Sequence, residues 1–121
     1  MQTLALIAHD GKKEAMAAFV REQAVSLARF DIVVTGTTAG VVIVAAPDLT
    51  VRAVNSGQRG GDVQIAAEVL EGGIVAVLFL VETMEAHPHD PDIRTLERIC
   101  TLQNVPLALN IATARLVLQG L

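Results

Sequence analysis

Carboxylates, a histidine and turns rich in small polar residues suit this chain to proton chemistry on a small phosphorylated molecule. Asp62 follows two glycines, and His89 and Asp92 belong to a proline-containing segment. Thr35-Gly36-Thr37-Thr38 and Ser56-Gly57 resemble turns that hold phosphate with hydroxyls and backbone N–H groups. A carboxylate can take a proton from carbon and a histidine can polarise the neighbouring oxygen, while the turns hold the phosphate.

These groups must be positioned by a fold, and short apolar runs alternate with longer segments of helical period. This pattern predicts repeated βαβ units and a parallel sheet. The run Ile74–Val81 is the most apolar, so we expect it centrally in the sheet. The expected strands are Thr3–Ala8, Phe30–Val34, Val51–Val54, Ile74–Val81 and Val105–Leu109, and the expected helices are Gly11–Leu27, Thr38–Ala46, Gly60–Glu71, Asp92–Gln103 and a last one from Ala112.

Each expected strand is followed by a polar cluster. These clusters are His9-Asp10, the threonine turn, Ser56-Gly57, Glu82 with the proline segment, and Asn110. In an open parallel sheet the ligand crevice lies beyond the carboxyl ends of the strands. We therefore expect the clusters to converge there.

Length and composition set further bounds. The chain of 121 residues fits one domain, residues 1–121. Its composition is 52% apolar and 18% charged, and such a high apolar fraction suggests doubly buried strands or a subunit interface. A net charge of −4 argues against nucleic-acid and anionic-membrane partners. No apolar stretch approaches the ~18 residues of a membrane span. The lone Cys100 cannot form an internal disulfide, so we expect a reducing, cytoplasmic location.

Five clusters, in this order, resemble those of the methylglyoxal synthase family. They are Ala8-His9-Asp10 with Lys13, Thr35-Gly36-Thr37-Thr38, Ser56-Gly57 followed by Gly60-Gly61-Asp62, Pro88-His89-Asp90-Pro91-Asp92, and Asn110-Ile111-Ala112-Thr113-Ala114. The resemblance implies conversion of dihydroxyacetone phosphate to methylglyoxal and inorganic phosphate without metal or organic cofactor. It also implies a three-layer α/β/α fold, with a five-stranded parallel, flavodoxin-like open sheet, and a homohexamer.

The resemblance also assigns roles to residues. Asp62 matches the base that removes a proton from the hydroxyl-bearing carbon of the substrate. His89 matches the residue that hydrogen-bonds the substrate carbonyl, and Asp92 orients it or shares its proton traffic. Asp10 supports the network and Glu82 stands where the family has a catalytic-site carboxylate. The residues expected to contact substrate or phosphate are His9, Lys13, Thr35, Gly36, Thr37, Thr38, Ser56, Gly57 and His89.

Other interpretations of the same residues stay open. Asp62 is also an ordinary first-turn carboxylate, and Pro88–Pro91 is also a solvent loop with Asp92 as a helix cap. A metal site at His87, His89, Asp90 and Asp92 is the weaker interpretation, because the prolines break regular ligand spacing. A related domain that binds phosphate or a phosphorylated metabolite as a sensor, without turnover, is the alternative function.

Three features depart from the family pattern. Glu82 replaces the usual aspartate and is one methylene longer, so it needs extra room or a shifted hydrogen bond. Gln58-Arg59 replaces the usual proline-containing turn and puts an extra cation near the expected phosphate site. The sequence ends at Leu121, without the usual C-terminal extension, so inhibition by phosphate is expected to be weakened or lost.

Overall fold

The computed structural model describes residues 1–84 and 90–121, together with the side chains of 1–84 and 93–121. All strand pairs of its sheet are parallel, and the strand order is β3-β2-β1-β4-β5. The strands are β1 (Thr3–Ala8), β2 (Asp31–Thr35), β3 (Val51–Val54), β4 (Ala76–Leu80) and β5 (Leu107–Ala108). The expected parallel α/β sheet is therefore confirmed. Its order differs from the 2-1-3-4-5 order of flavodoxin, so the likeness to flavodoxin is to the open, doubly wound sheet.

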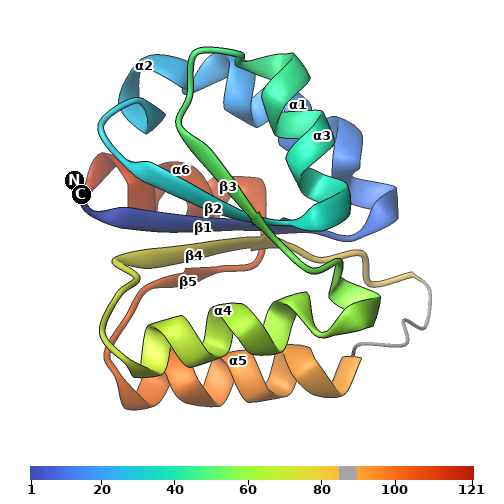
Figure 1. Cartoon of the computed structure of the whole chain (residues 1–121), viewed down its shortest axis with the longest axis vertical. Helices are drawn as coiled ribbons and strands as arrows, with labels where there is room; N and C mark the ends of the chain where they lie inside the picture. Colours follow the sequence, from blue (N-terminus) through green and yellow to red (C-terminus); the bar gives the residue numbers. More distant parts are fainter. Residues whose placement is uncertain (85–89) are drawn as a thin grey trace.

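Helices cover both faces of the sheet and make three layers (Figure 1). The helices are α1 (Lys13–Glu22), α2 (Ala24–Leu27), α3 (Gly36–Ala45), α4 (Gly61–Leu70), α5 (Asp90–Leu102) and α6 (Ile111–Gln119), with short 3₁₀ helices η1 (Asp10–Lys12) and η2 (Gly57–Arg59). One face packs against α1, α2, α3 and α6, and the other packs against α4 and α5. None of the described helices is long and apolar enough to cross a membrane.

The alternation of side chains along β1 explains why both faces are apolar. Leu4 and Leu6 pack toward α1, while Ala5 and Ile7 pack toward α4 and α5. All four residues are at most 2% exposed. Strands buried on both faces have nearly continuous apolar sequences, which is why periodicity indicated a parallel sheet here. The expected central strand, β4, lies between β1 and β5, and β1 is the middle strand.

Several expected boundaries were wrong. The single helix Gly11–Leu27 is interrupted at Gln23, whose φ of −104° and ψ of 15° leave the helical range, although no glycine or proline marks the break. The fifth strand is shorter than Val105–Leu109 because Pro106 has no N–H to donate, although its carbonyl accepts from Val77 N at 2.9 Å. The helix expected at Thr38–Ala46 is α3, and it begins at Gly36 with Thr35 as its N-cap. The threonine turn therefore forms the start of this helix.

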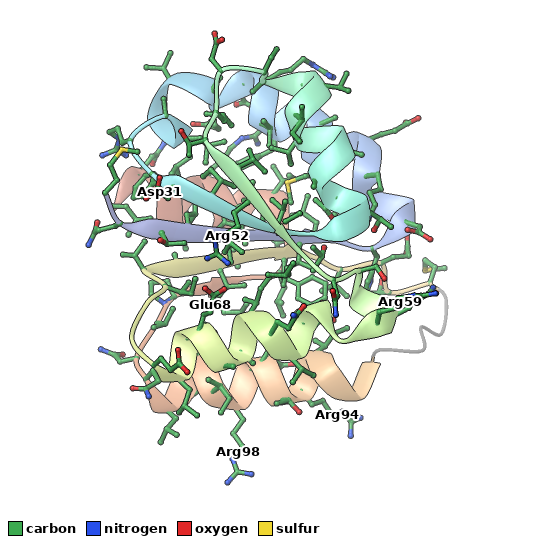
Figure 2. All side chains as sticks on the ribbon, in the orientation of Figure 1. Asp31, Arg52, Arg59, Glu68, Arg94 and Arg98 are labelled. Carbon is green, nitrogen blue, oxygen red and sulfur yellow. The ribbon has the colours of Figure 1, made fainter. Side chains whose placement is uncertain are left out.

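The connection from β3 to α4 brings two backbone segments unusually close. A Cβ built on Gly61 would lie 2.0 Å from the carbonyl oxygen of Asn55, so only glycine fits there. The preceding Gly60 has a φ of 89°, which also favours glycine. On the exposed side, the edge strand β3 is joined to α4 by an ion pair between Arg52 and Glu68 at 2.7 Å (Figure 2).

We predict that Gly61→Ala lowers the free energy of unfolding by about 1–3 kcal/mol, because the backbone at Asn55 must move away. Urea unfolding of the variant measures this change. Gly40→Ala is the matched control, since a Cβ there meets nothing within 4 Å and its position lies within α3. That control should stabilise the protein by about 0.4–1 kcal/mol. Equal effects of the two substitutions would contradict the close backbone contact at Gly61.

Candidate active site

A cavity of about 190 Å³ lies at the carboxyl ends of β1, β2 and β3. Seven of the expected site residues line it, and they are His9, Asp10, Lys13, Thr37, Ser56, Gly57 and Asp62. Ile7, Ala8 and Gln58 complete the described lining. The volume is below the ~300–1,000 Å³ of pockets for drug-sized ligands and suits a small metabolite.

Asp62 is the most deeply buried carboxylate of the lining, with 0% of its surface exposed. It lies in the first turn of α4, directly after the Gly60-Gly61 pair that carries the chain past Asn55. The positive end of the helix dipole favours a negative charge at that position. The sequence-based prediction that two glycines place Asp62 at a helix start agrees with this geometry.

Lys13 brings a positive charge to the same cavity, and neighbouring oxygen atoms hold its ammonium group. Its Nζ donates to the carbonyl of Ala8 at 2.6 Å and to Oγ1 of Thr38 at 3.2 Å, and lies 3.6 Å from Oδ1 of Asp10. Burial lowers the pKa of Lys13 below its ordinary 10.5, while the charges of Asp10 and Asp62 act in the opposite direction. The Asp10 side chain is 86% exposed, so an incoming anion can displace it from the ammonium more readily than the buried acceptors.

The three threonines expected to contact substrate or phosphate, Thr35, Thr37 and Thr38, have different surroundings. Thr37 lines the cavity, whereas Thr35 and Thr38 are buried with their hydroxyl oxygens 3.0 Å apart. Because Thr38 also accepts from Lys13, this pair supports the ammonium from behind. Thr35, Gly36 and Thr38 are not among the described residues that line the cavity, although they belong to the same helix start.

The backbone of Gly36 packs on the segment that carries Ser56. Its N–H donates to Asn55 O at 3.2 Å, and a Cβ on Gly36 would lie 3.2 Å from Ser56 N. Ser56 O in turn accepts from Gly61 N at 2.9 Å. The starts of α3 and α4 are therefore joined through this one segment, which places Thr37 and Ser56 on the same cavity.

His9 occupies the end of β1 and is 1% exposed. Its Nδ1 accepts a hydrogen bond from the backbone N–H of Glu82 at 2.9 Å, and its ring meets Phe79 edge to face. Glu82 itself is not among the described lining residues, although the sequence placed it among the catalytic groups. Its Oε1 accepts from Met84 N at 2.9 Å, so the longer acid is accommodated with a local backbone contact.

Part of the proline segment Pro88–Asp92 lies outside the described residues. His89 lies outside the described residues, and Asp92 belongs to the first turn of α5, of whose side chain nothing is described. The predictions made for both residues, and the metal-site interpretation of His87, His89, Asp90 and Asp92, are therefore untested. Asn110, expected at the same crevice, caps α6 by accepting from Thr113 N at 2.9 Å.

Gln58 was not among the residues expected to bind substrate, whereas the neighbouring Arg59 was expected near the phosphate site. Gln58 lines the cavity, while Arg59 is exposed and outside the described lining. Figure 2 shows the Arg59 side chain extending outward near the start of α4, at the end of the molecule where the strands finish. Its position directly after Ser56-Gly57 in the sequence could have indicated this role, and the structure places it with Gly57 in the same 3₁₀ helix, η2.

Comparison with known proteins identifies the family to which the chain is similar. Residues 15–109 match the model of the MGS-like domain family. A methylglyoxal synthase from Borreliella burgdorferi (strain ZS7) is 45% identical over 118 residues, which is 98% of this chain and 93% of that protein. The chain belongs to the methylglyoxal synthase family. A methylglyoxal synthase from Brucella anthropi is 43% identical over 98% of this chain and 94% of that protein.

Structural comparison agrees with this family assignment. The crystal structure of methylglyoxal synthase from Elizabethkingia anophelis NUHP1 superposes with a TM-score of 0.89 and 36% identity, covering 97% of this chain and 76% of that chain. The resemblance to the methylglyoxal synthase family seen in the motifs is thus confirmed. An uncharacterised Synechocystis protein is 47% identical over 96% of this chain, and the chain spans 27% of that protein's length.

The lowered pKa of Lys13 gives a pH-dependence for anion binding at this cavity. An ammonium binds phosphate and a neutral amine does not, so affinity for inorganic phosphate should fall as pH rises, with the loss beginning below 10.5. The chain has no tyrosine, and burial raises the pKa of Cys100 to about 11, so neither a phenol nor this thiol accounts for a loss that begins below 10.5. Calorimetric titration with phosphate measures the effect.

Lys13→Arg is the control for this pH-dependence, because a guanidinium stays charged throughout the window. Its phosphate affinity should be lower at all pH values because the geometry changes, but it should lack the alkaline loss. An identical alkaline loss in both proteins would assign the titration to another group.

Proposed function

We propose that the protein converts dihydroxyacetone phosphate to methylglyoxal and inorganic phosphate. The observation that carries the proposal is the buried Asp62 carboxylate sharing one small cavity with the Lys13 ammonium and a turn of small polar residues. A base, a cation and anion-binding donors within one cavity are what elimination of phosphate requires. Relatives named methylglyoxal synthase, similar over nearly the whole chain, support the same activity.

The first step is removal of a proton from carbon. The Asp62 carboxylate takes the proton from the hydroxyl-bearing carbon, and the electron pair moves toward the carbonyl to give an enediolate. His9 is proposed to contact the substrate at this stage, and His89, by resemblance, to hydrogen-bond its carbonyl oxygen. Donors placed where negative charge develops lower the barrier to enolisation.

The second step breaks the carbon–oxygen bond to phosphate. Loss of the enediol hydroxyl proton forms the aldehyde, the double bond shifts by one carbon, and the phosphate leaves with its electron pair. Lys13, Thr37 and the Ser56-Gly57 turn are proposed to bind the phosphate as its charge grows. The remaining enol takes a proton on its terminal carbon and becomes methylglyoxal.

The groups proposed to bind the phosphate also decide which product forms. A carbon–oxygen bond held perpendicular to the plane of the enediol overlaps with its π system and breaks, whereas a bond held in that plane keeps the phosphate in place. Thr37 and Ser56 are fixed relative to Asp62 by the contact of Gly36 and Gly61 with the Asn55-Ser56 backbone. That fixed relation allows the cavity to select elimination.

We predict that Asp62→Asn lowers kcat at least about a hundredfold while inorganic phosphate still binds, because the base is removed and the shape is kept. A coupled assay with dihydroxyacetone phosphate, following methylglyoxal and phosphate together, measures the change. Wild-type turnover in the variant would remove Asp62 from its role. A wild-type protein that binds phosphate but releases neither product would instead be a sensor of phosphorylated metabolites.

Lys13→Ala and Thr37→Ala provide the contrast to the Asp62 variant. Both should raise KM more than Asp62→Asn does, with a change of about tenfold for the loss of a charged hydrogen-bond donor at Lys13. Unchanged phosphate affinity in both variants would place the phosphate elsewhere in the cavity.

We further propose that the protein is a homo-oligomer, a hexamer by resemblance, and that α3 lies in a subunit contact. This helix has no charged residue, and its Ile43 and Val44 are 50% and 82% exposed. An apolar helix at the surface favours cover by a partner. Sedimentation should give a multiple of the 12.8 kDa protomer mass, reduced by Val44→Glu. A monomer at micromolar concentration would contradict this assembly.

A cytoplasmic location completes the proposal. The single Cys100 is 1% exposed, and burial raises its pKa to about 11, so the thiol stays protonated in the core. A lone reduced thiol suits a reducing compartment, and neither it nor the acidic net charge indicates a nucleic-acid or membrane partner.

A further inference from the structure

Glu82, just after β4, contacts the turn that follows β1 through both its backbone and its side chain. Its N–H donates to Nδ1 of His9 at 2.9 Å. Its carboxylate lies beside Gly11: a Cβ built on that glycine would be 3.0 Å from Oε2 and 3.4 Å from Cγ of Glu82. A side chain at residue 11 would therefore require the carboxylate to shift, and whether Glu82 can do so decides the cost.

Further contacts limit how far Glu82 can move away. Its Oε1 accepts from Met84 N at 2.9 Å, and just before it the Leu80 carbonyl accepts from His9 N at 3.1 Å. The Met84 hydrogen bond thus fixes the Glu82 carboxylate to its own backbone, and hydrogen bonds from His9 N to Leu80 and from Glu82 N to His9 Nδ1 join that backbone to residue 9. A change at residue 11 would be transmitted to the Glu82 backbone and from there to the histidine ring.

The hydrogen bond from Glu82 also determines the form of the neutral imidazole. A backbone N–H can only donate, so Nδ1 must be the unprotonated nitrogen, and the ring hydrogen resides on Nε2. The edge-to-face contact with Phe79, with ring centroids 5.2 Å apart, further restricts the ring. His9 is thereby prepared as an N–H donor in a residue that lines the cavity.

We propose that Gly11 and Glu82 form a matched pair that positions the His9 imidazole as an N–H donor. Glu82 is a positioning residue here: it acts through His9, and its side chain is not part of the described cavity lining. The absence of a side chain at residue 11 provides the room that the longer acid needs. The consequence for turnover rests on the proposed function, while the consequence for the imidazole does not.

The cost of a side chain at residue 11 would be steric. Gly60 and Gly72 are the described glycines with left-handed φ, and Gly11 is not among them, so alanine is conformationally acceptable there. Any loss in Gly11→Ala would therefore come from the contact with Glu82. Gly120→Ala is the matched control, because a Cβ at Gly120 would make only ordinary van der Waals contacts, the nearest 3.5 Å from Val117 O, and Gly120 is outside the described cavity lining.

A double-mutant cycle tests the pair. It compares wild type, Gly11→Ala, Glu82→Asp and the double variant by kcat on dihydroxyacetone phosphate and by the ¹⁵N shifts of the His9 ring, assigned with His9→Gln. Gly11→Ala should lower kcat about tenfold through displacement of a substrate-contacting group, and bring the two ring-nitrogen shifts closer together. In the Glu82→Asp background, where the carboxylate is withdrawn by one methylene, the same substitution should change kcat less than about twofold.

Each outcome of this cycle decides something. Equal effects of Gly11→Ala in the two backgrounds, or unchanged His9 shifts in the single variant, would overturn the pairing. If Gly11→Ala does not fold, the double variant must fold, and its failure to do so would also overturn it. If the wild type lacks turnover, the proposed function fails, and the ¹⁵N shifts still test the pair. Gly120→Ala should leave both readouts at wild-type values.

Discussion

The backbone of Asn55 and Ser56 lies directly against two glycines, and the arrangement of the site depends on that contact. Gly36 starts α3 and Gly61 starts α4, and a Cβ on either would press on this segment. Because both helix starts are held by one stretch of backbone, Thr37, Ser56 and Asp62 reach the same cavity from three different parts of the chain. Backbone contacts of this kind preserve geometry better than long side chains, which must lose rotamer freedom to hold a position.

A second constraint is electrostatic. The cavity contains buried Asp62 and mostly buried Lys13, and a charge removed from water must be compensated. Lys13 is compensated by the Ala8 carbonyl, the Thr38 hydroxyl and the nearby carboxylate of Asp10. Thr35 supports Thr38 from behind. These oxygen atoms hold the ammonium in place before any ligand arrives, so less reorganisation is needed when an anion binds.

Much of the fold and part of the site could be predicted from sequence. The apolar runs indicated the parallel sheet because its strands are buried on both faces, and β3 was predicted with its observed bounds, Val51–Val54. The break at Gln23 was not predictable, since no residue type marks it. Residue types also could not separate Thr37, which faces the cavity, from Thr38, which faces Lys13, because adjacent helical positions point in different directions.

Both ends of the chain lie at the side of the molecule opposite the carboxyl ends of the strands (Figure 1), and near the N-terminus the Gln2 carbonyl accepts from Asp31 N, at the start of β2, at 2.9 Å. The Leu121 carbonyl accepts from Arg29 Nη1 at 3.1 Å, which ties the last residue to the same region. A short linker joining the termini would therefore span little distance, and the chain could be opened at another surface loop as a circular permutant. Any domain fused at either end would also leave from the side away from the cavity, so the fold can be built into longer polypeptides without covering its site.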